Sequence, residues 1–87
     1  MEILNLKDIV RKDVPIYYRR HYESTAVLKI AAASGEYRVN FTIEQQPTGK
    51  KLIKITLVDT IDYPLIPLIK ELKEYICNLD TNGGLPD

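Results

Sequence analysis

The apolar residues of this chain change their spacing near Asp59, and that change constrains the fold more than any other feature. Before Asp59 they mostly alternate with polar residues, which is the period of a β-strand; from Asp62 to Asp80 they recur every three or four residues, as in an α-helix. An antiparallel sheet with one apolar face can be closed by one helix. The sequence therefore predicts a single α+β domain over residues 1–80, a three- or four-stranded antiparallel meander packed by one C-terminal helix.

Four segments carry the strand pattern, and polar turns separate them. The alternation is clearest in 37–45, where every second residue from Tyr37 to Ile43 is apolar, which predicts one buried and one wet face. Pro15 cannot donate a ladder hydrogen bond, and neither face of the first segment is cleanly apolar, so we expect that strand at an edge of the sheet. The expected strands are 14–22, 26–32, 37–45 and 52–59, with turns at 23–25, at 33–36 around Gly35, and at 47–50.

The helix that should cover the sheet has a well-marked start and end. Asp62 is a suitable N-cap, and Gly83 and Gly84 can adopt the left-handed conformation that ends a helix. We expect residues 81–87 to form a flexible tail. The predicted core-facing stripe follows helical spacing and consists of Leu65, Leu68, Ile69, Leu72, Ile76 and Leu79.

Residues 1–13 allow two interpretations. Leu6, Ile9 and Val10 have helical spacing and Asn5 can cap a first turn, which favours a short helix over residues 6–12. Ile3 and Leu4 could instead belong to a strand at the edge of the sheet.

Composition narrows the class of protein. The 12 basic and 12 acidic residues balance, although residues 1–59 hold 10 basic and 7 acidic ones and residues 60–87 hold 2 and 5. One cysteine, Cys77, permits no internal disulfide, whereas small secreted domains usually have several. No segment resembles a signal peptide or a membrane span of about 20 apolar residues. We therefore expect a cytoplasmic protein that does not engage a membrane.

The segment Tyr17-Tyr18-Arg19-Arg20-His21-Tyr22 is the local cluster best suited to binding a ligand. Tyrosine rings offer stacking faces, and arginines offer forked donors for phosphates or carboxylates. Strand alternation places Tyr17, Arg19 and His21 on one face. The alternative interpretation is an edge strand that charge and aromatic groups protect from aggregation. The complete candidate ligand surface is Tyr17, Arg19, His21, Arg38, Lys50, Lys51 and Lys54.

The sequence contains no pattern that predicts catalysis or a cofactor. Gly49-Lys50 lacks the earlier glycine and the following Ser or Thr of a phosphate-binding loop, which favours a hairpin tip. His21 and Cys77, each the single residue of its type, cannot by themselves form a four-ligand zinc site. We therefore expect no enzyme activity, metal, cofactor or small-molecule ligand. The predicted function is an interaction or assembly module that binds a protein partner or forms a homodimer; the alternative is a nucleic-acid-binding accessory protein.

Overall fold

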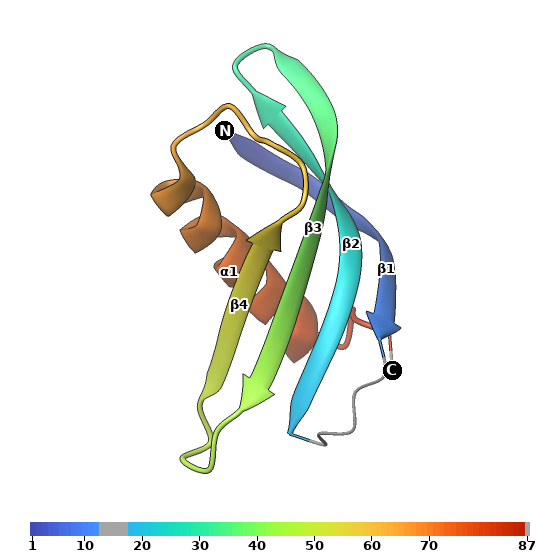
Figure 1. Ribbon diagram of the computed structural model, residues 1–87, viewed down its shortest axis with the longest axis vertical. Helices are drawn as coiled ribbons and strands as arrows, with labels where there is room; N and C mark the ends of the chain where they lie inside the picture. The colour runs from blue at the N-terminus through green and yellow to red at the C-terminus, as the bar shows by residue number, and fades with distance from the viewer. Residues whose placement is uncertain (13–17, 87) are drawn as a thin grey trace.

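The computed structural model describes residues 1–12 and 18–86, which form a sheet and a helix packed on one of its faces (Figure 1). The described residues contain a four-stranded antiparallel sheet in the order β1-β2-β3-β4. The predicted α+β fold, with its meander and its C-terminal helix, is confirmed. The elements are β1 Glu2–Lys12, β2 Arg19–Ile30, β3 Ala33–Gln45, β4 Lys51–Leu57 and α1 Leu65–Thr81.

The predicted short helix over residues 6–12 is wrong, because this segment is part of β1 and pairs with β2. The helical spacing of the apolar residues has a different cause. The register shifts between Lys7 and Val10, where Asp8 adopts a left-handed φ of 52°. This bulge adds a residue to β1, so the inward-facing Leu6 and Ile9 lie three positions apart rather than two or four.

The two strands predicted at 14–22 and 26–32 are largely one strand, β2, and the turn predicted at 23–25 is wrong. Residues 13–17, the beginning of the first predicted strand, lie outside the described residues. Ser24 is buried in the middle of β2, where its hydroxyl donates a 2.7 Å hydrogen bond to the carbonyl of Val39. Because this bond satisfies the hydroxyl, a polar residue can sit inside a continuous strand. The predicted edge position is also wrong, since β2 lies between β1 and β3.

The β2–β3 turn lies at Ala31 and Ala32, not at the predicted 33–36. Ile30 pairs with Ala33, and the positive φ of the turn, 57°, belongs to Ala31. Gly35 is instead a regular β3 residue opposite Leu28. The sequence pattern misled here because glycine is the usual residue at positive φ.

Replacing Ala31 with Gly is expected to raise the free energy of unfolding. A left-handed conformation costs an L-residue about 1–2 kcal/mol, and the added chain entropy of glycine costs about 0.5–1 kcal/mol. The net gain should therefore be about 0.5–1 kcal/mol, measured by urea denaturation. Ala32→Gly is the matched control, because Ala32 is equally exposed but has no positive φ to relieve. A stabilising effect of Ala32→Gly as large as that of Ala31→Gly would contradict the turn geometry.

The other predicted turn and the helix end are confirmed. The β3–β4 hairpin turns at 46–50, with Gly49 at φ 87° and its N–H bonded to the carbonyl of Gln46. At the end of α1, Gly83 has φ 73° and the N–H of Gly84 bonds to the carbonyl of Leu79. The predicted N-cap is wrong, because Pro64 holds that position without a side-chain cap. The division into a domain over 1–80 and a flexible tail over 81–87 stays a prediction.

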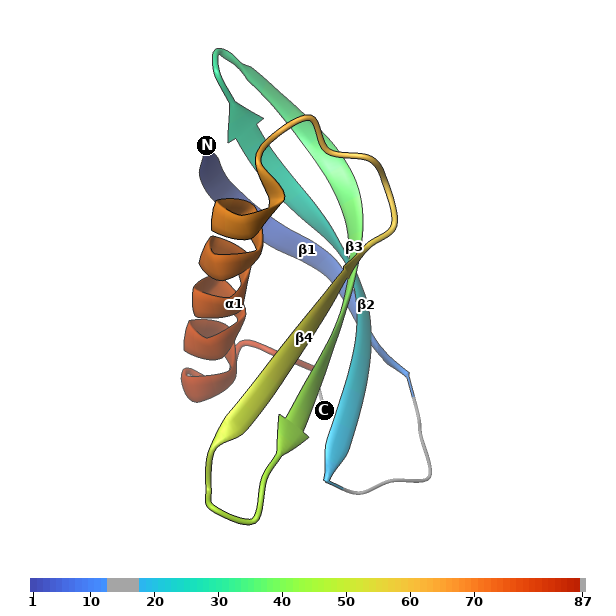
Figure 2. The ribbon, with the colours of Figure 1, turned by 60° about the vertical axis from the view of Figure 1, so that its left-hand side comes forward.

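Helix α1 covers one face of the twisted sheet (Figure 2). Leu68, Leu72 and Ile76 are fully buried against that face, and the rings of Tyr22 and Phe41 stack beneath them with centroids 4.9 Å apart. The core also takes in the loop before the helix through Ile61. The buried apolar residues are Leu6, Tyr22, Ala26, Leu28, Val39, Phe41, Ile43, Ile53, Ile61, Leu68, Leu72 and Ile76.

Candidate functional site

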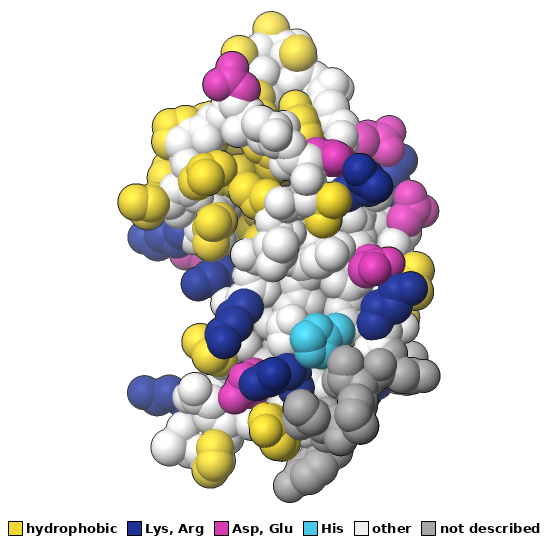
Figure 3. Space-filling view, viewed as in Figure 1, with side chains coloured by type: hydrophobic (Ala, Val, Ile, Leu, Met, Phe, Trp, Pro, Cys, Tyr) yellow, Lys and Arg dark blue, Asp and Glu magenta, His cyan; other side chains and the backbone are white. Residues whose placement is uncertain are grey.

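The face of the sheet turned away from α1, which we call the open face, holds much of the predicted ligand surface. The strand registers align His21 of β2 with Thr42 of β3 and Lys54 of β4, in one row across the sheet. Arg19 lies in the neighbouring row, opposite Glu44. Figure 3 shows the single histidine, in cyan, among basic and acidic side chains on this side of the molecule. Four strands thus bring distant charged and polar groups onto one surface.

Carboxylates accompany the cations of this region, so the predicted basic stripe is a mixed-charge surface. Arg19 and Glu44 are 3.0 Å apart, and Lys12 and Glu23 are 3.4 Å apart. On β1 and β3, Lys7 and Glu36 approach to 2.8 Å. Such exposed pairs add little stability, but each places a negative charge beside a positive one.

Arg38 is held most fully. Its guanidinium contacts both carboxylate oxygens of Asp59, at 3.1 and 3.4 Å, and its backbone N–H donates to the same carboxylate at 2.8 Å. The side-chain hydrogen bond from Arg38, followed by its backbone hydrogen bond, lowers the pKa of Asp59 below its ordinary value. Asp59 is therefore a stable counter-charge for Arg38 at neutral pH.

Two shallow hollows adjoin on the open face and share Glu23 and Asn40. One, of about 280 Å³, extends towards the β1 bulge at Asp8 and towards Arg38. The other, of about 350 Å³, is lined by His21, Lys12 and Thr42 among others. Within the second, the hydroxyl of Thr42 and Nδ1 of His21 lie 3.2 Å apart, within hydrogen-bonding distance. These polar hollows suit water or a polar side chain of a partner better than an apolar ligand.

The remaining predicted ligand residues do not join the open face. Lys50 is exposed in the β3–β4 hairpin, and Lys51 directs its ammonium group to the opposite side, towards α1. Tyr17 lies outside the described residues. The structure thus brings together Arg19, His21 and Lys54, with Arg38 further along β3.

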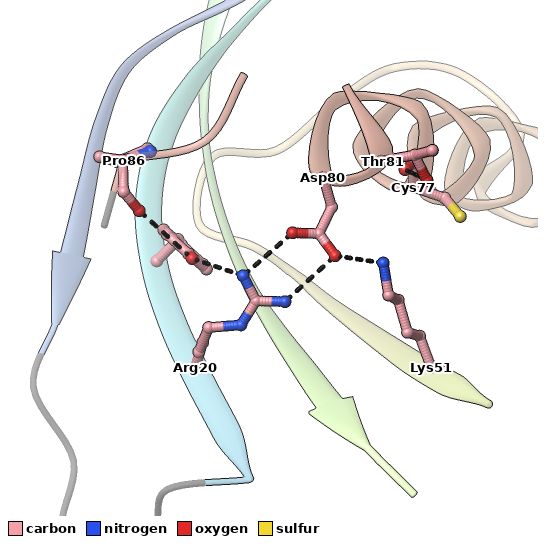
Figure 4. A network of polar contacts seen from close by, with 7 residues as sticks. Arg20, Lys51, Cys77, Asp80, Thr81 and Pro86 are labelled. Atoms are coloured by element: carbon pink, nitrogen blue, oxygen red, sulfur yellow. Dashed lines mark hydrogen bonds and ion pairs between the residues drawn. The ribbon is translucent and has the colours of Figure 1, made fainter. Parts of the chain in front are cut away.

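Sequence reasoning missed an ionic cluster at the end of α1 (Figure 4). Arg20 of β2 holds Asp80 through two parallel hydrogen bonds of 3.0 and 3.1 Å, and Lys51 of β4 contacts the same carboxylate at 2.7 Å. Arg20 also donates to the hydroxyl of Tyr22, which in turn donates to the carbonyl of Pro86 at 3.5 Å. The cluster joins two strands, the helix and the C-terminal segment.

One sequence signal could have revealed this cluster. The last turn of α1 contains Asp80 and no basic residue, which is unfavourable at the negative end of the helix dipole. An acidic residue in that place indicates a cation supplied by another element. The hydrogen bonds from Arg20, and then those from Lys51, lower the pKa of Asp80 below its ordinary value despite partial burial. The side chain of Asp80 is only 10% exposed, which suits a structural role.

A second surface runs along one flank of the molecule, where β4 lies beside α1. A groove of about 300 Å³ is lined by Leu52, Ile53, Cys77, Lys73 and Glu74. Lys73 and Glu74 also border the hollow around Ile66 and Ile69 on the outer face of the helix, so the two depressions are continuous. We call this surface the apolar flank; with the exposed residues next to it, its apolar members are Leu52, Ile53, Val58, Leu65, Ile66, Ile69 and Cys77.

Two further classes of site are absent from residues 1–12 and 18–86. No three His, Cys, Asp or Glu side chains in this part of the chain are grouped so that they could hold a metal ion. The same residues contain no helix with the length and apolar character needed to cross a membrane.

Comparison with known proteins identifies a family for almost the whole chain. The model of the BB_0187 family matches residues 1–81, which include all four strands of the sheet and the whole of α1. No curated protein and no solved structure matches the chain.

Proposed function

The chain belongs to the BB_0187 family, and we propose that this protein is a small non-enzymatic interaction module that forms a homodimer through the apolar flank. The exposure of large apolar side chains along β4 and α1 carries the proposal. Ile66 is 86% exposed, and Leu65, Leu52 and Val58 also show much of their surface to solvent. In Figure 3 yellow side chains gather over the beginning of α1 and the adjoining end of β4. An apolar group of this kind marks a contact surface.

The charges of the open face support this choice over the nucleic-acid alternative. A surface that binds phosphates needs cations free to replace counterions. Arg19 and Arg38 instead hold Glu44 and Asp59, and Lys12 holds Glu23. Binding a polyanion there would require these carboxylates to be displaced or to lie against phosphates. We also place the module in the reducing cytoplasm, because Cys77 leaves no internal disulfide.

Light scattering over a range of concentrations tests this function. We expect a concentration-dependent dimer, and no salt-sensitive binding of DNA or RNA by fluorescence anisotropy. Ile66→Ser should raise the dimer dissociation constant about fivefold or more, since covering one Ile side chain is worth about 1.5–3 kcal/mol. Glu71→Ser, at another exposed position of α1, is the control and should leave dimerisation unchanged. A strictly monomeric protein that binds RNA in a salt-dependent way would reverse the assignment.

A further inference from the structure

The two edges of the sheet differ in their ability to accept another strand. Strand β1 has two register shifts, between Ile3 and Asn5 and between Lys7 and Val10, and such bulges interrupt the regular row of backbone groups on an edge. Strand β4 pairs with β3 through seven consecutive residues without a shift, and it contains no proline. Among the described residues, none pairs with its outer side. Strand β4 is therefore the edge that can continue the sheet.

The hydrogen-bond pattern identifies which backbone groups of β4 face outward. The N–H of Val58 bonds to the carbonyl of Arg38, and the N–H of Gln46 bonds to the carbonyl of Lys50. In an antiparallel pair, residues facing the neighbour alternate with residues facing away. The even-numbered residues of β4 therefore face β3, and Ile53, Ile55 and Leu57 turn their N–H and C=O groups to the free edge.

We propose that a second copy of this chain pairs with β4 edge to edge, antiparallel, about a twofold axis at Ile55. Each Ile55 then exchanges two hydrogen bonds with the Ile55 of the other copy, and Ile53 does so with Leu57. The side chains of Leu52 and Val58 meet on the open face, and Lys54 lies opposite Thr56. The two sheets become one continuous eight-stranded sheet. This inference rests on the proposed dimer and specifies its geometry.

Residue complementarity selects this register over its neighbours. An axis at Lys54 would place two ammonium groups directly opposite each other, which is unfavourable in a cross-strand pair. An axis at Thr56 would move Lys54 opposite the apolar Val58. The axis at Ile55 opposes no like charges, and it lets Leu52 and Val58, 38% and 46% exposed, cover each other.

The surroundings of the edge favour a copy of the same chain as the occupant. The groove lined by Leu52, Ile53 and Cys77 lies directly beside β4, so pairing would also cover apolar side chains. Lys73 and Glu74 border this groove with opposite charges, and a twofold axis brings each near the same pair in the other copy. A stable dimer usually buries about 800 Å² on each partner, so we expect this flank of α1 to contribute alongside the strands.

Opposite charges introduced at Thr56 test the register. Thr56 is exposed and would face Lys54 of the other copy twice per dimer. Thr56→Lys should raise the dimer dissociation constant, and Thr56→Glu should lower it, each by roughly 2- to 30-fold, from two cross-strand charge pairs. Analytical ultracentrifugation at low salt measures both, and added salt should reduce both effects. Thr48→Lys and Thr48→Glu, in the exposed hairpin beyond the paired residues, control for net charge and should leave the constant unchanged.

Amide hydrogen exchange supplies a second readout that does not depend on substitution. The N–H groups of Ile53, Ile55 and Leu57 should become more protected as the concentration rises through the dissociation constant, while those of Lys54 and Thr56 are protected by β3 at every concentration. A dimer in which both Thr56 variants shift the constant in the same direction, or in which those three amides stay unprotected, would overturn the β4 pairing and leave the proposed self-association standing. A protein that stays monomeric at all concentrations would overturn both.

Discussion

Replacing Leu72 with Ala is expected to lower the free energy of unfolding by about 2–5 kcal/mol, the usual cost of truncating a fully buried leucine. Leu72 has no exposed surface and lies on α1 between Leu68 and Ile76, which are equally buried against the sheet. A domain of this length is stable by only about 5–10 kcal/mol. One truncation should therefore remove a large share of the stability, as measured by urea denaturation.

The neighbouring position supplies a matched control. Lys73 is exposed on the same helical turn, so Lys73→Ala should change the free energy of unfolding by no more than about 0.5 kcal/mol. Both substitutions end in alanine, so helix propensity contributes little to the difference between them. Equal effects of the two would show that α1 does not present Leu72 to the sheet.

The helix and the third strand could be predicted because their apolar periods are long and uninterrupted. The stripe from Leu68 to Ile76 keeps one helical face over several turns, and β3 alternates from Tyr37 to Ile43. Burial follows these periods directly, and the residues at the stripe's centre are those the structure buries most. Glycines at positive φ also marked the β3–β4 hairpin and the end of α1 correctly.

The first half of the sheet could not be predicted for two physical reasons. The bulge at Asp8 shifts the alternation of β1 by one residue and imitates helical spacing. In β2, Ser24 is a buried polar residue whose partner, the carbonyl of Val39, comes from another strand. A single sequence shows neither an extra residue in a ladder nor a hydrogen bond made across it.

The candidate site shows the same division between local and long-range information. Alternation predicts that Arg19 and His21 share a face, and the registers agree. Alternation cannot show that Glu44 lies beside Arg19, because that depends on the pairing of β2 with β3. The partner of Arg20 is still more distant, since Asp80 is 60 positions further along the chain.

Replacing Asp80 with Asn is expected to destabilise the protein by about 1–2 kcal/mol at pH 7. Losing the charge weakens the paired hydrogen bonds from Arg20 and the contact with Lys51, and charge-assisted hydrogen bonds are worth about 1.5–3 kcal/mol. The change also removes a negative charge from the C-terminal end of α1, which returns about 0.3–1 kcal/mol. The first effect is larger, so the net change is a loss, measured by urea denaturation.

The difference between the wild type and Asp80→Asn should depend on pH in one direction. Hydrogen bonds from Arg20 and Lys51 lower the pKa of Asp80 in the folded protein, so its carboxylate stabilises the fold fully above the unfolded pKa, near 4. That stabilisation is lost as the pH falls through the lower, folded pKa, because the wild-type carboxyl then becomes protonated and neutral. Asp62→Asn, at an exposed position, is the control and should leave the pH profile of the wild type unchanged. A difference between wild type and Asp80→Asn that persisted undiminished well below the folded pKa would show that shape, rather than the ionised carboxylate, fastens the end of α1 to the sheet.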